Sequence, residues 1–224
     1  MQRFAVIGLG RFGAQLAKGL TRAGAEVVAI DKDRKIIENI SSEVTVAVRL
    51  DSTDEDALLA QGVDKVDVAI IGIGQGFETS ILTTVTLKSI GVKHICARAE
   101  RQMHGRILRR IGADEIIFPE DESAQRWAFR LMAPQISEKL EFAPGFSLAQ
   151  YTAPGSFQDK TIIELQLRKK YRVNLIGFRR AETKSDTKLS RQVINVPQPD
   201  TVIHKGDLLW LVGSDEDLAT LPEK

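Results

Sequence analysis

Three glycines near the N-terminus have the spacing of a phosphate-binding turn. Gly8, Gly10 and Gly13 stand in FAVIGLGRFG, residues 4–13, directly behind an apolar run. In a G-x-G-x-x-G turn the first glycine makes the tight turn, the second lets the backbone approach a phosphate, and the third lets helix and sheet pack closely. The N-terminus of the following helix adds N–H donors and partial positive charge. We expect this turn to hold a nucleotide; a glycine turn without a ligand is the alternative.

A carboxylate follows at the spacing expected for a ribose contact. Asp31 ends the next apolar run, 18 residues after Gly13. There it can accept hydrogen bonds from a ribose diol. Its negative charge would repel a 2′-phosphate, which disfavours NADP. An adenine nucleotide is therefore the expected ligand.

A cation, Arg11, stands inside the same turn. A diphosphate held by backbone N–H groups needs no side-chain cation, so we expect Arg11 to serve a group farther out. A guanidinium can hold a terminal γ-phosphate through two parallel hydrogen bonds, and its long side chain can reach across a dimer cleft. The alternative is a solvent-exposed helix arginine paired with a nearby carboxylate.

The catalytic groups of a hydride-transfer enzyme are not evident. Such an enzyme needs a proton relay or a base near the nicotinamide. Tyr151 and Tyr171 are followed four residues on by Gly155 and Leu175, not by the lysine of a Tyr-x-x-x-Lys pair. The histidines have no evident carboxylate partner and are expected to be solvated or structural: His94, His104 and His204. The nucleotide is thus predicted to be a signal and not a reagent, with an NAD-dependent oxidoreductase as the alternative.

The composition narrows the class of protein. The 224 residues carry a formal net charge of +1, which argues against a nucleic-acid binder. Cys96 is the one cysteine, so no internal disulfide forms, and we expect a small buried residue there. No apolar run approaches the roughly 20 residues of a membrane helix, and no secretory signal opens the chain. We expect a soluble cytoplasmic protein; a redox-sensing transcription factor would need a winged helix before the first strand.

The elements that must position these residues follow from the apolar pattern. Continuous apolar runs that alternate with amphipathic segments predict a doubly wound parallel sheet, covered by helices on both faces. The predicted strands are residues 3–8, 26–30, 44–48, 66–72, 94–97 and 115–118. A helix over 119–134 follows, with an apolar stripe that includes Trp127. That stripe is expected to cover its own domain or to contact another domain or subunit.

The pattern changes after this helix. Residues 135–145 are weakly patterned and indicate a linker. Beyond them, strands are predicted at 146–153, 173–180, 191–196 and 207–213, helices at 161–171 and 214–221, and a polar loop at 184–188. The predicted organisation is a Rossmann-like nucleotide-binding domain over 1–134, the linker, and a small α+β domain over 146–224.

Further motifs resemble a known family. Beside the glycine turn and Asp31 stand LDSTDEDAL (50–58), LTTVTLKSIGV (82–92), CARAE (96–100) and IGADEIIFPE (111–120). Together they are similar to a regulator of potassium conductance domain (RCK, also called KTN), and residues 146–224 resemble its C-terminal lobe. The resemblance implies a cytosolic regulatory subunit of a Ktr/Trk potassium uptake system. Such subunits form dimers, often octameric rings, on a membrane channel subunit and bind ATP, ADP or NAD(H).

The resemblance also implies roles for individual residues. Arg11 would contact the nucleotide of the neighbouring subunit, so ATP and ADP would set different dimer angles. Arg98 would contact the phosphates, with a salt bridge to Glu100 or Asp114 as the alternative. The other residues expected in the nucleotide site are Gly8, Leu9, Gly10, Phe12, Gly13, Asp31, Lys32, Asp51, Ser52, Ile73, Gly74 and Glu120.

Glu120 is also a candidate metal ligand. It follows the last strand of the predicted parallel sheet, where a buried carboxylate near the phosphates could help to hold Mg²⁺ or Ca²⁺, as in some relatives. The alternative is a carboxylate at a helix N-terminus that interacts with the helix dipole.

The C-terminal lobe carries part of a pattern that resembles a cyclic di-AMP site. The matching residues are Ile162, Ile163, Arg168, Asn174, Leu175 and Ile176. Gln166 stands where the pattern has an acid. The alternative is that the apolar positions form core and the basic ones a solvated helix end.

Overall fold

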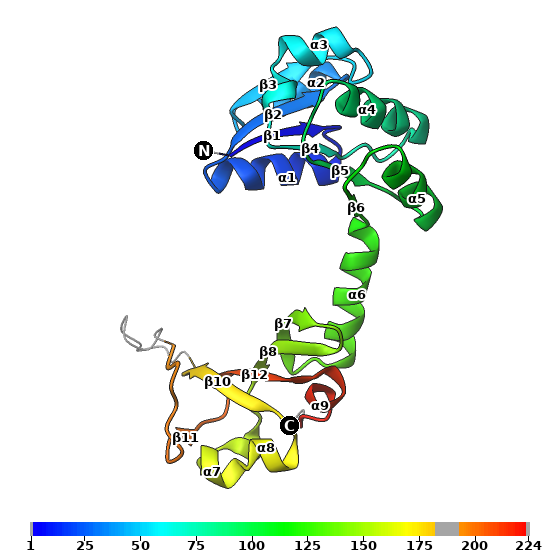
Figure 1. The fold of residues 1–224 in the computed structure, drawn as a ribbon. Helices are drawn as coiled ribbons and strands as arrows, with labels where there is room; N and C mark the ends of the chain where they lie inside the picture. The colour runs from blue at the N-terminus through cyan, green and yellow to red at the C-terminus, as the bar shows by residue number, and fades with distance from the viewer. Residues whose placement is uncertain (1, 182–192, 223–224) are drawn as a thin grey trace. The chain divides into compact units, whose positions relative to one another are not determined.

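The computed structural model describes residues 2–181 and 193–222 (Figure 1). The chain folds into two compact units, Met1–Ser123 and Ala124–Lys224. The division falls inside α6 (Pro119–Met132), whereas the sequence predicted that this helix belongs to the first domain.

The first unit contains a six-stranded parallel sheet in the order β3-β2-β1-β4-β5-β6. Its strands lie close to the predicted apolar runs. They are β1 (Arg3–Ile7), β2 (Glu26–Asp31), β3 (Val46–Arg49), β4 (Val68–Ile71), β5 (Ile95–Arg98) and β6 (Glu115–Ile117). The strand order reverses between β1 and β4, and the carboxyl ends of strands at such a switch point are where open α/β sheets bind ligands.

Helices cover both faces of this sheet, as the continuous apolar strands predicted. On one face, side chains of α1 (Arg11–Arg22) and α2 (Arg34–Ile40) pack on Val6, Val27 and Ala29. On the other, α3 (Glu55–Ala60), α4 (Phe77–Ser89) and α5 (Gln102–Arg110) pack on Ala5, Ile7 and neighbouring strand residues. A short 3₁₀ helix, Val63–Lys65, follows α3. The doubly wound Rossmann-like fold is thereby confirmed.

The second unit is built on an antiparallel sheet in the order β10-β12-β8-β7. Its strands are β7 (Ile136–Ala143), β8 (Phe146–Thr152), β10 (Asn174–Arg179) and β12 (Leu208–Ser214). A second sheet pairs β9 (Lys160–Thr161) with β11 (Val202–Ile203). Short helices complete the unit: the 3₁₀ helix Gly155–Phe157, α7 (Ile162–Leu165), α8 (Leu167–Lys170) and α9 (Asp215–Ala219).

The predicted linker over 135–145 is wrong, because residues 136–143 form the edge strand β7. Its side chains are mostly exposed, among them Leu140 and Phe142, so the strand shows no buried apolar run. Gly145, with φ of +73°, turns the chain from β7 into β8. Ile136 is buried against β8 and anchors the start of the hairpin.

Two further predictions for this unit need correction. The predicted helix 161–171 is broken into α7 and α8 at Gln166, whose φ of +48° lies in the left-handed region. Within the described part of the predicted strand 191–196, Ile194 makes an isolated bridge with Phe178 instead of a strand. The predicted loop 184–188 lies outside the described residues.

Candidate functional site

The glycine turn between β1 and α1 is packed too closely for side chains at two of its positions. A Cβ on Gly13 would lie 2.0 Å from the carbonyl oxygen of Gly8. Gly8 has φ of +86°, and a Cβ there would lie 2.8 Å from the backbone nitrogen of Ile73. These contacts explain why the first and third glycines are required, and they show that Ile73 lies beside the turn.

Gly10 differs from these glycines because nothing lies within 4 Å of the position of its Cβ. It is the N-cap of α1, and because glycine has no side chain, no N-cap side chain accepts from the first N–H groups of the helix. The first turn of the helix also contains no acidic residue. The exposed backbone at Gly10 therefore faces open space beside helix N–H donors, which is the arrangement that an anionic phosphate requires.

Asp31 joins the end of β2 to the glycine turn. Its Oδ2 accepts a hydrogen bond from the Leu9 N–H at 2.7 Å, and its Oδ1 accepts one from the Asp33 N–H at 2.9 Å. Each carboxylate oxygen has a second lone pair, so Asp31 can still accept from a ribose hydroxyl. The sequence reasoning did not foresee that Asp31 also fixes the turn.

Lys32 and Asp51 lie at the ends of the neighbouring strands and are both exposed. Asp51 accepts hydrogen bonds from the N–H and the hydroxyl of Thr53 at 3.0 and 2.8 Å. These bonds, with a smaller contribution from the Lys32 charge, lower the pKa of Asp51. A charged carboxylate and an ammonium group are thus both available next to Asp31.

The hydroxyl of Ser52, a residue expected in the nucleotide site, contacts another side chain of the protein. Ser52 is buried, and its Oγ lies 2.7 Å from Oγ1 of Thr83 on α4. The pair holds the β3–α3 connection against α4. Thr83 was missed, because α4 contains several other polar residues and nothing in its sequence marks this threonine as the partner of Ser52.

Arg98 extends from the end of β5 over Gly74 and pairs with Glu120. Its Nη2 lies 2.6 Å from Oε1 of Glu120, and a Cβ on Gly74 would lie 2.7 Å from its Nη1. The Arg98 side chain is only 14% exposed, and its Nε has no hydrogen-bond partner among the described residues. The salt bridge to Glu100 or Asp114 considered from the sequence is replaced by this pair.

Glu120 is not the buried carboxylate that the sequence predicted. Its side chain is 65% exposed, and it lies in the first turn of α6. Glu120 is therefore a surface carboxylate at the start of α6 that forms an ion pair with Arg98.

Arg11 lies exposed at the start of α1, with no ion pair or side-chain hydrogen bond among the residues described, and Phe12 beside it is half-buried. The nearby carboxylate partner that the alternative required for Arg11 is therefore not found in the described part of the chain. Its guanidinium is available to a ligand or to another protomer.

The cyclic di-AMP candidates lie in the second unit. Ile163, Arg168, Asn174 and Ile176 are exposed, Leu175 is half-buried, and Ile162 packs against the core of the unit. The aliphatic positions are thus not all accounted for by core packing.

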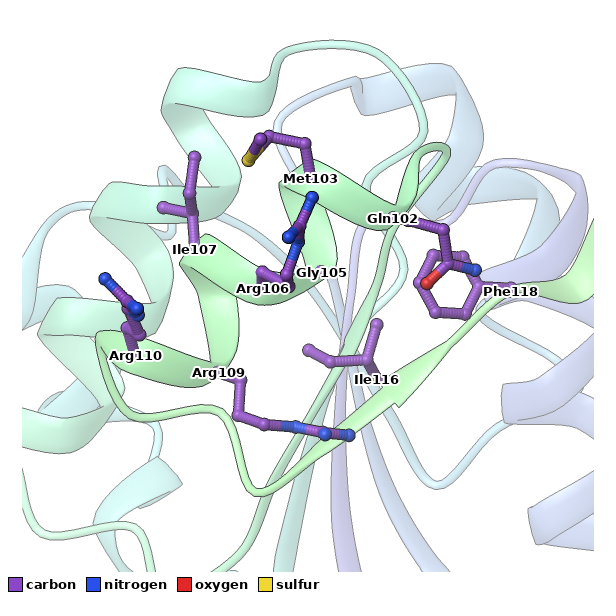
Figure 2. A pocket seen from close by; sticks show the side chains of 9 residues that line it. All are labelled: Gln102, Met103, Gly105, Arg106, Ile107, Arg109, Arg110, Ile116 and Phe118. Carbon is purple, nitrogen blue, oxygen red and sulfur yellow. The ribbon is translucent and has the colours of Figure 1, made fainter.

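A pocket of about 440 Å³ lies over α5 and β6 (Figure 2). Its lining combines apolar residues with three arginines: Gln102, Met103, Gly105, Arg106, Ile107, Arg109, Arg110, Ile116 and Phe118. None of these residues belongs to the glycine turn, and sequence reasoning assigned no site here.

Two histidines have carboxylate partners that the sequence did not reveal. His94 Nε2 lies 3.1 Å from Glu115, and His204 Nδ1 lies 3.3 Å from Asp159. His104 instead stacks on Phe77, with ring centroids 3.9 Å apart.

Cys96 is buried as expected. Burial, together with the charges of Glu115 and Asp114, raises its pKa to about 11.

In the part of the chain that the structure describes, no helix is long and apolar enough to cross a membrane.

Two family models match the chain: the TrkA-N domain over residues 4–119 and the TrkA-C domain over residues 149–224. The Ktr system potassium uptake protein C of Bacillus subtilis (strain 168) is 34% identical over 223 residues, which are 100% of this chain and 97% of that protein. The Ktr system potassium uptake protein A of the same organism is 32% identical over 97% of this chain and 94% of that protein.

A solved structure of the GsuK RCK domain has the same fold. It matches with a TM-score of 0.59 and 19% identity over 97% of this chain, and this chain spans 46% of the GsuK chain. The chain therefore belongs to the family of proteins built from a TrkA-N and a TrkA-C domain, which includes the Ktr potassium uptake proteins.

Proposed function

We propose that this protein is a nucleotide-sensing regulatory subunit of a membrane potassium channel or transporter. The observation that carries the proposal is the open backbone at Gly10, at the N-terminus of α1, in a chain that matches a Ktr potassium uptake protein along its whole length. The subunit acts at the cytoplasmic face of the membrane through its partner. It binds no nucleic acid.

The described residues fit an adenine nucleotide. Backbone N–H groups at Gly10 and the start of α1 would bind the phosphates, and the Arg98 guanidinium adds positive charge at this edge of the sheet. Asp31 would accept from the ribose, with Lys32 and Asp51 around the adenosine. The ligand is ATP, ADP or NAD(H), since the Asp31 carboxylate disfavours a 2′-phosphate.

The nucleotide acts by changing how subunits contact one another. Leu82 and Val85 on α4 and Met103 on α5 are exposed apolar side chains on two helices that touch, and Trp127 and Leu131 are exposed on α6. Such surfaces favour a homodimer, and repeated contacts of this kind would build an octameric ring. A nucleotide shifts the balance between two arrangements of the subunits only if it makes different contacts in the two arrangements.

Two additional ligands are proposed for the same protein. Mg²⁺ or Ca²⁺ would bind with the nucleotide through Glu120. Cyclic di-AMP would bind the second unit, where the exposed Ile163 and Ile176 offer apolar surface for adenine and Arg168 offers charge for phosphate. Calorimetry on the full chain tests the second idea: Arg168→Ala should abolish the binding heat, and Lys170→Ala should retain it. If the unmutated protein gives no binding heat with cyclic di-AMP, the cyclic di-AMP proposal is wrong.

The central experiment compares the binding of ATP, ADP, NAD and NADH by calorimetry. Gly10→Ala should lower the affinity at least ~10-fold, because its methyl group would stand where a phosphate approaches the backbone. Gly19→Ala is the matched control, since Gly19 lies in α1, the helix that Gly10 caps, and nothing surrounds its Cβ position either. Equally weak binding of all four nucleotides would overturn the proposal. Sustained turnover of an alcohol or 2-hydroxy acid with NAD would instead support an oxidoreductase.

A further inference from the structure

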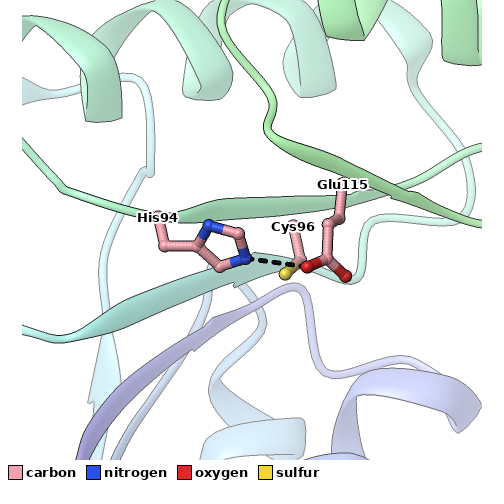
Figure 3. Close-up of side chains that lie close together, drawn as sticks. All are labelled: His94, Cys96 and Glu115. Carbon is pink, nitrogen blue, oxygen red and sulfur yellow. Dashed lines mark hydrogen bonds and ion pairs between the residues drawn. The ribbon is translucent and has the colours of Figure 1, made fainter.

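Three potential metal ligands converge where β5 and β6 begin. His94 directly precedes β5, Cys96 is its second residue, and Glu115 is the first residue of β6. Cys96 and Glu115 are paired in the register of the two parallel strands, and alternation along β5 puts His94 on the same face as Cys96. Figure 3 shows the imidazole, the thiol and the carboxylate turned toward one another.

The spacing of the donor atoms is close to that of a metal centre. One ligand atom from each residue lies within 4.8 Å of the other two, and the His94 Nε2 to Glu115 Oε1 distance is 3.1 Å. Ligand atoms around tetrahedral Zn²⁺ are about 3.3–3.6 Å apart, given metal–ligand bonds of about 2.0–2.3 Å. Small side-chain rotations are therefore enough to close the site.

The chemistry of the donors selects the metal. Thiolate and imidazole ligands with one carboxylate suit Zn²⁺ and not Mg²⁺ or Ca²⁺, which prefer oxygen ligands alone. Asp114 adds a further negative charge beside the cluster, since its Oδ2 lies 3.8 Å from His94 Nδ1. A bound cation would also neutralise the two carboxylates beside the thiol and displace its proton.

The cluster is accessible to a metal ion from solvent. The side chains of His94 and Glu115 are 39% and 65% exposed, while Cys96 is buried beneath them. It lies at the amino end of β5, whereas the glycine turn, Arg98 and Glu120 follow the carboxyl ends of strands. The cluster is therefore separate from the nucleotide site.

We propose that His94, Cys96 and Glu115 form a Zn²⁺ site with three protein ligands and a fourth position open to water or another ligand. The site joins the amino ends of β5 and β6. Its existence does not depend on the proposed function.

Cobalt provides the test on the full chain after treatment with a chelator. Because Cys96 is the one cysteine, a thiolate-to-Co²⁺ charge-transfer band can come from this residue alone. We expect one Co²⁺ per chain, this band in the near ultraviolet, and displacement by Zn²⁺, which binds more tightly. Cys96→Ala should abolish the band, and His94→Gln and Glu115→Gln should each weaken Co²⁺ binding at least ~100-fold, since even outer-shell changes cost ~10–100-fold.

His204→Gln is the matched control, because His204 also pairs with a carboxylate, Asp159, but belongs to no such cluster among the described residues. It should bind Co²⁺ as the parent does. Absence of the band in the parent would overturn the proposal, and so would parental affinity in both His94→Gln and Glu115→Gln. These two exposed positions keep the test valid even if Cys96→Ala does not fold.

Discussion

Arg11 and Arg22 occupy opposite ends of α1, and both are exposed. Arg22 lies 3.5 Å from Glu43, a surface pair, whereas Arg11 has no ion pair in the described part of the chain. An unpaired guanidinium beside helix N–H donors concentrates positive charge at the glycine turn. That charge can distinguish ligands that differ in their number of phosphates.

Arg11→Ala should therefore weaken ATP binding ~10–100-fold and leave ADP binding near the parental value, because hydrogen bonds to charged groups contribute ~1.5–3 kcal/mol. Calorimetry with both nucleotides measures the ratio, and Arg22→Ala serves as the control. If Arg11→Ala still separates ATP from ADP as the parent does, this arginine is surface charge.

Glu120 has two candidate partners, Arg98 and a divalent cation. Glu120→Gln should remove the dependence of nucleotide binding on Mg²⁺ or Ca²⁺, since a neutral amide is a much poorer cation ligand. Glu122→Gln, an exposed position on the same helix, should keep that dependence. Unchanged cation dependence in Glu120→Gln would mean that the carboxylate serves Arg98 alone.

Residue types and spacing predicted the glycine turn and placed Asp31 at the end of the second strand, but they did not predict the hydrogen-bond partners within the site. The G-x-G-x-x-G spacing is informative because Gly8 and Gly13 have backbone atoms where a Cβ would be. The partners of Ser52 and Arg98 come from α4 and α6, which lie far along the chain. No local pattern encodes such pairs.

At the scale of elements, Gly105 lets α5 approach β6. A Cβ at this position would lie 2.8 Å from Phe118 and 2.9 Å from Ile116. Gly105→Ala should lower the free energy of unfolding by ~1–3 kcal/mol, as overpacking does. Denaturant titration measures it, with Gly19→Ala as a control that should stabilise α1 by ~0.5–1 kcal/mol. A gain in stability for Gly105→Ala would show that the two side chains yield easily.

Asp215 connects α9 to the antiparallel sheet. Partial burial opposes its ionisation, but hydrogen bonds from Lys139 and Ser147, at 2.6 and 2.8 Å, and the Lys139 charge outweigh burial and lower its pKa below the ordinary 3.8. A carboxylate with a depressed folded pKa stabilises the fold above its unfolded pKa, and this stabilisation is lost as the pH falls through the folded pKa.

Asp215→Asn should therefore lower stability at pH 7 and flatten the decline of stability below about pH 4. Urea unfolding at several pH values measures this, and Glu216→Gln, an exposed neighbour, should keep the parental profile. A parental slope in Asp215→Asn would show that the ion pair does not contribute.

Elements with a buried apolar face were predicted well, and elements without one were not. The strands of the parallel sheet are continuous apolar runs because both faces are covered. The edge strand β7 exposes Leu140 and Phe142 and therefore has no such signature. The left-handed backbone at Gln166 has no local signal either, because glycine or asparagine would be the usual residue there.

At the scale of the whole molecule, the exposed apolar side chains of α4 and α5 need a partner to leave water. Leu82→Glu should shift the protein toward smaller assemblies, because a charge would have to be buried at a subunit contact. Leu59→Glu is the matched control: Leu59 on α3 is 41% exposed and Leu82 is 47% exposed, so both variants should fold.

Sedimentation velocity with ATP and with ADP measures the assembly and its response to nucleotide. We expect parental sedimentation for Leu59→Glu, a lower coefficient for Leu82→Glu, and different coefficients for the ATP and ADP states of the parent. If Leu82→Glu sediments as the parent does, subunits do not meet through α4.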